Sequence, residues 1–357
     1  MALNPDHNTR HPALPTEGNR SSLMPPGSAQ DAIDAPDHRP GSAPTGTGLA
    51  ALDAARGYAR EALSPATLRA YEADWAHYQA WCRDAGWAPL PAAPAGVAAY
   101  LSSMAPTHSR ATIRRRLVAI GQRHKLAGEA WIPAHPLIRA TLRGMGRRHG
   151  VPARQAAAIA SPEVKRLVAT CDAGLADLRD RALFLLGLAA ALRRSELAAL
   201  GREHLDFRSD GSLRLLLPRA KGDQGGEGHW IGLPRGKGRD TCPVRALEAW
   251  LEAADCRYGP VFRKIDRWGN LSEGALHPDA VRQVLLRRAT QAGLQAPGGE
   301  RLSPHGLRAG FITEAYQAGA RDEHIMAHTR HRDLKTMRGY VRRARLVQDS
   351  PAGLLGL

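Results

Sequence analysis

Residues 183–197 read LFLLGLAAALRRSEL, an apolar run that ends in two adjacent arginines and a glutamate. Leu and Ala are strong helix formers, so the run predicts one long buried helix over about 176–200. Arg193 and Glu196 are three residues apart and therefore lie on the same face of that helix. On a surface such a pair is a weak ion pair, but a helix that is apolar on most sides places one of its arginines in an unusual environment.

Elements on both sides of this run predict a domain that is mainly helical. Two short strands, 212–218 and 229–233, flank a Gly-rich turn at 221–228 and indicate a hairpin with a long tip. Upstream, Ser161 and Pro162 predict the start of a helix and of the domain. Apolar spacing predicts further helices at about 243–254, 278–293, 304–319, 321–328 and 333–345. The expected fold class is therefore mainly α, with one small antiparallel sheet.

The N-terminal part of the chain has a different composition. Eight of the 25 prolines lie in residues 1–50, among Gly, Ser and Asp, which is typical of a disordered tail. Residues 51–150 predict a small helical domain, with Ser64 as the N-cap of its first long helix. Three more helices are expected at about 93–104, 108–126 and 136–148. Residues 151–160 are expected to form a linker, and 161–357 the second domain.

The chain is strongly basic. It contains 50 Lys and Arg against 34 Asp and Glu, and only six of the cations are Lys. The guanidinium fork of Arg grips two phosphate oxygens at once, which the ammonium of Lys does not. Residues 51–150 carry a net charge of +8 and residues 151–357 of +10, so both predicted domains favour a polyanionic partner. A coding bias that raises Arg and Ala everywhere is the alternative, and it leaves the acidic N-terminal stretch unexplained.

One helix of the first predicted domain gathers basic residues near its start. These residues are Arg110, Arg114, Arg115 and Arg116. Such a face predicts a surface that contacts the groove or the backbone of a nucleic acid. A solvated helix face explains the same segment equally well.

Several classes of protein are excluded by what the sequence lacks. It has no Walker loop, no GxGxxG after a strand, no HExxH and no GxSxG. The four cysteines lie far apart with no C-x-x-C pair, which argues against a zinc ribbon and a disulfide framework. No apolar stretch approaches the length of a membrane span, and the N-terminus does not resemble a secretory signal. The expected location is the cytoplasm.

Two segments near the C-terminus carry side chains suited to phosphate chemistry. SPHGLR predicts a helix with Ser303 as its N-cap, which places His305 and Arg308 beside free backbone N–H groups, a ready anion site. His331 precedes Tyr340 by nine residues, and several arginines surround this tyrosine. An H-x-x-R pair is expected by chance in a chain so rich in both residues, and an aromatic that packs inward also explains Tyr340 taken alone.

The order of these groups along the chain is far more specific than any of them singly. Over about residues 55–350 the sequence resembles the tyrosine recombinase, or phage integrase, family. The segments LRRSEL, HGLR and H-x8-Y resemble the family's motifs, and helices at 67–81 and 112–150 resemble its core-binding domain. The matching groups occur in the family's order: Arg193, Lys221, His305, Arg308, His331 and Tyr340.

The resemblance implies a fold and a reaction. The fold is a two-domain C-clamp, with a small helical (SAM-like) core-binding DNA domain and an α+β catalytic domain. Tyr340 would attack a DNA phosphodiester, form a 3′-phosphotyrosine and release a 5′-hydroxyl, so that no cofactor and no metal is needed. The other implied roles are phosphate binding by Arg193, Arg308 and His331, proton acceptance by His305, proton donation by Lys221, and support of the site's cations by Glu196.

The resemblance also implies partners. The substrate would be double-stranded DNA, bound by a homotetramer on paired sites and by a monomer or dimer off DNA, with accessory factors and a location at the nucleoid. Two residues depart from the family's pattern, since Ala191 and Arg330 stand where many relatives have Gly. Two alternatives stay open at this point: a type IB topoisomerase-like enzyme, and a catalytically silent DNA-binding protein of the same fold.

Overall fold

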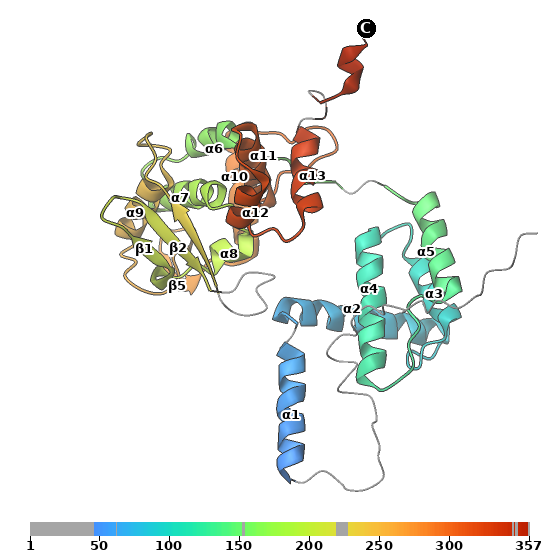
Figure 1. The fold of residues 1–357 in the computed structure, drawn as a ribbon. Helices are drawn as coiled ribbons and strands as arrows, with labels where there is room; N and C mark the ends of the chain where they lie inside the picture. The colour runs from blue at the N-terminus through green and yellow to red at the C-terminus, as the bar shows by residue number, and fades with distance from the viewer. Residues whose placement is uncertain are drawn as a thin grey trace, which may run out of the picture. The chain divides into compact units, whose positions relative to one another are not determined.

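The computed structural model describes residues 46–61, 63–151, 154–218, 228–344, 346 and 349–355. The chain divides into two compact units, Met1–Pro152 and Ala153–Leu357 (Figure 1). Lys221, the long hairpin tip and most of the expected N-terminal tail lie outside the described residues. None of the described helices is long and apolar enough to cross a membrane.

The described residues of the first unit form five helices joined by loops, with no strand among them. Its second helix begins as the sequence predicts, because the Ser64 hydroxyl accepts a hydrogen bond from the Thr67 backbone N–H at 3.2 Å. Tyr78 and Tyr100, buried with ring centroids 4.8 Å apart, lie at the centre of the core. The first helix begins inside the stretch expected to be a disordered tail. The helices are α1 (Gly46–Glu61), α2 (Pro65–Ala85), α3 (Pro94–Ser103), α4 (Arg110–Leu126) and α5 (Pro136–Arg148).

The second unit combines helices with two small antiparallel sheets. Strands β1 (Leu205–Phe207), β2 (Leu213–Leu217) and β3 (His229–Leu233) pair in that order, and β4 (Arg263–Ile265) pairs with β5 (Leu271–Ala275). The predicted hairpin of β2 and β3 is confirmed. The helices are α6 (Ser161–Val168), α7 (Leu175–Ala189), α8 (Arg194–Ala198), α9 (Pro243–Ala253), α10 (Pro278–Gln291), α11 (His305–Gln317), α12 (Asp322–Thr329) and α13 (Leu334–Ala344), with short 3₁₀ turns η1 (Arg202–His204) and η2 (Pro351–Leu354).

The prediction of one long helix over 176–200 is wrong. Helix α7 ends at Ala189, and Ala191 adopts a left-handed backbone conformation with φ 47°. The Leu192 N–H turns back to the Gly187 carbonyl at 3.1 Å, which closes the end of the helix. The chain then restarts as α8 directly after Arg193, so the break places this arginine at a helix start, outside the apolar run.

The segment 154–160, expected to be part of a linker, belongs to the second unit and packs against α11. The Ile159 N–H donates to the Gly306 carbonyl at 2.9 Å, and Ile159 is buried. A Cβ at Gly306 or at Gly310 would lie 2.3 and 2.1 Å from backbone oxygens of this segment, so α11 meets it backbone to backbone. Ser161 is the first residue of α6 and donates to the Glu314 carboxylate at 2.8 Å.

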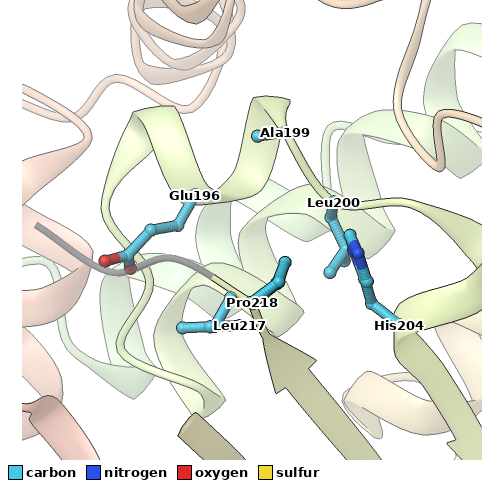
Figure 2. A pocket seen from close by; sticks show the side chains of 6 residues that line it. All are labelled: Glu196, Ala199, Leu200, His204, Leu217 and Pro218. Atoms are coloured by element: carbon cyan, nitrogen blue, oxygen red, sulfur yellow. The ribbon is translucent and has the colours of Figure 1, made fainter. Parts of the chain in front are cut away.

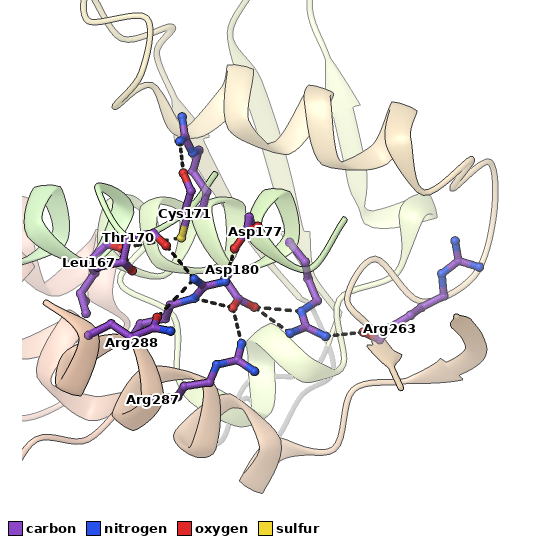
Figure 3. Close-up of polar contacts among 11 residues, drawn as sticks. Leu167, Thr170, Cys171, Asp177, Asp180, Arg263, Arg287 and Arg288 are labelled. Carbon is purple, nitrogen blue, oxygen red and sulfur yellow. Dashed lines mark hydrogen bonds and ion pairs between the residues drawn. The ribbon is translucent and has the colours of Figure 1, made fainter. Parts of the chain in front are cut away.

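A buried ion network connects α7 to α10. The Asp180 carboxylate is completely buried and accepts from Arg179 at 2.7 Å, from Arg287 at 2.7 Å and from Arg288 at 2.9 Å (Figure 3). Arg288 also donates to the Thr170 carbonyl at 2.7 Å. A buried carboxylate is stable only when cations and donors surround it, and Asp180 meets that condition.

We expect Asp180→Asn to lower the free energy of unfolding by about 3–5 kcal/mol, because it leaves the buried Arg179 without its charge partner and leaves Arg288 with Asp177 as its remaining carboxylate. The matched control is Asp279→Asn, which breaks an exposed pair with Arg194 at 2.6 Å and should cost less than about 1 kcal/mol. Urea denaturation of both variants measures the difference. Equal losses would show that the network contributes no more than a surface ion pair.

Candidate active site

Helices α11 and α13 bring together two of the predicted site residues. The His305 Nε2 and the Tyr340 hydroxyl are 2.7 Å apart, and the His331 ring centroid lies 6.0 Å from that of Tyr340. His305 is the first residue of α11 and is exposed, whereas Tyr340 is half-buried. The cap predicted at Ser303 is wrong: Pro304 occupies the N-cap position, and Ser303 accepts from the Gly306 N–H through its backbone carbonyl at 2.8 Å.

Arg308 lies one turn further along α11 and is only 1% exposed. Its Nη1 donates to the Ala191 carbonyl at 2.8 Å, and its Nη2 donates to the Thr329 carbonyl. Burial, together with repulsion from Arg193 and Arg330, lowers the pKa of Arg308 to about 9. An anion placed beside this guanidinium would offset the cost of its desolvation and favour its charged form.

Arg193 is held by Glu196 in the first turn of α8. The Glu196 carboxylate accepts from the Arg193 backbone N–H at 2.8 Å and from its Nη1 at 2.6 Å. The buried Arg330 donates to the same carboxylate at 2.9 Å. The predicted pair of Arg193 and Glu196 therefore exists, but it is part of a cluster with a third residue that the sequence analysis did not place in the site.

His331 is oriented by Thr329. The Thr329 hydroxyl donates to the Ile325 carbonyl at 2.6 Å and therefore accepts from His331 Nδ1, 2.7 Å away. Burial, followed by the charges of Arg308 and Arg193, lowers the pKa of His331 to about 4. The ring is thus neutral at pH 7, with its proton on Nδ1.

A hollow of about 340 Å³ adjoins Glu196, the residue that holds Arg193 and Arg330 (Figure 2). Its walls are mainly apolar, and Glu196 is the acidic residue at its edge. Pro218, at the end of β2, also lines it, and the chain leads from there into the segment that carries Lys221. The full lining is Glu196, Ala199, Leu200, His204, Leu217 and Pro218. In the described part of the chain no group of three His, Cys, Asp or Glu side chains is arranged to hold a metal ion.

The basic residues predicted on α4 have different environments. Arg110 and Arg114 are exposed. Arg115 holds the buried Asp74 of α2 through two hydrogen bonds of 2.6 and 2.9 Å, although half of its side chain is exposed. Arg116 is buried, 3.5 Å from Asp74, and donates to the Tyr100 hydroxyl at 3.4 Å. Arg116 is therefore a core residue and presents no surface to DNA.

Helix α5 carries a basic stripe that the sequence analysis missed. Arg139, Arg143 and Arg147 are four residues apart and are all exposed. The Arg110 guanidinium approaches this helix, since a Cβ at Gly146 would lie 3.2 Å from it. Arg110 of α4 and the exposed arginines of α5 thus share one region of the first unit. We call the surface formed by Arg110, Arg139, Arg143 and Arg147 the α4–α5 basic face. The four-residue spacing of the α5 arginines in the sequence could have predicted the stripe.

Comparisons with known proteins agree with this arrangement. The model of the phage integrase family matches residues 158–345. An integrase/recombinase XerD homolog of Selenomonas ruminantium is 33% identical over 288 residues, which cover 80% of this chain and 83% of that protein.

Solved structures show the same fold. The Tn1549 transposon integrase in complex with transposon right-end DNA has a TM-score of 0.55 at 14% identity, covering 83% of this chain and 97% of that one. A lambda integrase dimer bound to a COC′ core site has a TM-score of 0.53 at 15% identity, covering 80% and 92%. These likenesses do not favour the topoisomerase or the silent DNA-binding alternative. The chain belongs to the phage integrase family and is a site-specific tyrosine recombinase.

Proposed function

We propose that Tyr340 is the nucleophile that cuts and rejoins DNA. Its oxygen attacks the scissile phosphorus and forms a phosphotyrosine bond on the 3′ side, while the bond from phosphorus to the 5′ oxygen breaks. The Tyr340 proton passes to His305, whose Nε2 lies 2.7 Å from the hydroxyl, and this contact is the observation that carries the proposal. The phosphotyrosine bond replaces the broken phosphoester bond and keeps its energy, so the 5′-hydroxyl of a DNA strand can attack the phosphotyrosine, release Tyr340 and reseal the duplex.

The neighbouring cations stabilise the charge that develops on the phosphate. Arg308 and Arg193 present guanidinium groups that are already fixed by carbonyls and by Glu196, so little reorganisation is needed when the transition state forms. His331 donates from Nε2 once the bound phosphate has raised its pKa. Lys221, which lies outside the described residues, is proposed to protonate the departing 5′ oxygen, as the family resemblance implies.

We propose that both units bind double-stranded DNA, the first through the α4–α5 basic face. The solved structures named above contain DNA, namely transposon right-end DNA for the Tn1549 integrase and a COC′ core site for the lambda integrase dimer. The guanidinium groups of the basic face are suited to bind phosphate oxygens. Assembly into a homotetramer on paired sites, with accessory factors, remains part of the proposal, as does action on the nucleoid in the cytoplasm. In recombination, two cut duplexes exchange strands. One protomer on one site cuts a single strand of one duplex, so several protomers are needed.

Substitution of one arginine of the basic face should reduce the salt dependence of DNA binding. Each phosphate contact that is lost lowers the slope of log affinity against log salt by about 0.9, because one fewer counterion is released. We expect this change for Arg143→Gln, measured by fluorescence titration with a labelled duplex of arbitrary sequence. Arg83→Gln, an exposed arginine at the end of α2, is the control and should leave the slope unchanged. Equal slopes for both variants and the wild type would exclude α5 from the interface.

A further inference from the structure

The C-terminal end of α7 is closed by side chains from a distant part of the chain. The last carbonyls of a helix have no partner within it, and cations are favourable beside them. His328 donates to the Ala189 carbonyl at 2.9 Å, and Arg330 reaches the carbonyls of Ala190 at 3.5 Å and of Ala191 at 3.2 Å. The segment that ends α12 therefore fixes the turn that leads to Arg193.

Arg330 also reaches Arg193 by a second route. Its Nη2 lies 2.9 Å from Glu196 Oε2, the same oxygen that accepts from the Arg193 backbone N–H at 2.8 Å. Glu196 Oε1 holds the Arg193 guanidinium at 2.6 Å. The Arg330 side chain is only 7% exposed, and its hydrogen bonds go to Glu196 and to backbone carbonyls.

The local conformation makes an arginine at this position unfavourable. Arg330 has φ 59° and Ala191 has φ 47°, a backbone region that glycine adopts without strain and other residues rarely occupy. The buried Nε of Arg330 has no hydrogen-bond partner among the described residues. The left-handed backbone conformation and the burial of the charged side chain both cost free energy. An arginine that is present despite these two costs points to a role in the site.

We propose that Arg330 is a positioning residue for strand cleavage: it clamps Glu196 and the turn at 190–192 so that the Arg193 guanidinium is fixed before DNA binds. The role differs from that of the phosphate-binding arginines, because Arg330 acts through Glu196 and through backbone carbonyls. It explains why a side chain occurs where the backbone alone would favour glycine. The inference rests on the proposed function of Arg193.

Arg330→Gly and Arg330→Lys test this role. Arg330→Gly relieves the backbone strain and removes the clamp, whereas Lys keeps the charge and reaches one acceptor. The control is Arg321→Gly at the N-cap of the same helix, where the side chain is exposed and glycine is well tolerated. The substrate is a nicked duplex that carries the site recovered from covalent wild-type adducts, and its single-turnover cleavage rate and dissociation constant are both measured.

We expect Arg330→Gly to cleave about 10–100-fold more slowly, the effect of displacing a catalytic group by a fraction of an ångström, with the dissociation constant within about twofold of wild type. Arg330→Lys should recover part of the rate. Hydrogen exchange of the amides at 189–197 should rise in Arg330→Gly and stay unchanged in Arg321→Gly.

Two results would overturn the proposal: cleavage by Arg330→Gly at the wild-type rate, or a loss of rate that is matched by an equal loss of DNA affinity. A wild type that forms no adduct would refute the proposed function instead. In that case hydrogen exchange still decides the positioning role, because unchanged exchange at 189–197 in Arg330→Gly would exclude it.

Discussion

Replacing Tyr340 by phenylalanine is expected to abolish covalent attachment of DNA, a loss on the order of 10⁴-fold or more, because the nucleophilic oxygen itself is removed. The measurement requires no knowledge of the target site. Wild type and variant are expressed in cells, the protein is denatured, and any DNA that stays attached is sequenced. Wild-type adducts identify the recombination site at the same time.

The substitution should leave the fold and DNA binding nearly intact. The Tyr340 ring packs on a small cluster formed by Ile312, Ile325, Met337 and Val341, and phenylalanine preserves that contact. The hydroxyl contacts His305, which is exposed, so water can replace the hydroxyl beside the imidazole. Tyr316→Phe, a second tyrosine packed on the same cluster, is the matched control and should form adducts as the wild type does.

Each other outcome has a clear meaning. Adducts in both Tyr340→Phe and the wild type would show that another side chain is the nucleophile. An equal loss of DNA affinity would make Tyr340 a structural residue, and the absence of adducts from the wild type would count against the proposed reaction.

Part of the geometry of the candidate site follows from spacing along the sequence. Arg193 and Glu196 are three residues apart at the start of α8, so local spacing brings them together, and His305 and Arg308 lie one helical turn apart on α11. The contact between His305 and Tyr340 spans 35 residues, and no periodicity predicts it. It followed from the family resemblance, which supplies the tertiary arrangement that spacing lacks.

The break after α7 could not be predicted from propensity. Ala190, Ala191 and Leu192 are good helix formers, and neither Gly nor Pro marks the end of the helix. Side chains of His328, Arg330 and Arg308 close the helix from more than 100 residues away, so tertiary contacts override the local preference. The same limit applies to Arg116, because the sequence gives no sign that its partner Asp74 is buried on α2.

A lysine at position 308 should reduce the rate of strand cleavage by about 10²–10³-fold, the loss that follows removal of one donor from a preorganised anion site. Lysine keeps the positive charge but lacks the planar fork, so it cannot hold the Ala191 and Thr329 carbonyls and bind a phosphate oxygen at once. One of these carbonyls loses its partner, and the free energy of unfolding falls by about 1–3 kcal/mol.

The rate and the stability must be measured separately to assign the effect. Single-turnover cleavage of the nicked duplex is followed well below the unfolding temperature of each variant, and DNA affinity is determined under the same conditions. Arg282→Lys, an exposed arginine on α10, is the matched control and should match the wild type in rate and stability. Cleavage by Arg308→Lys within about threefold of the wild-type rate would mean that a positive charge alone suffices at this position. The buried position of Arg308 between two backbone carbonyls argues instead that the reaction depends on the planar guanidinium group.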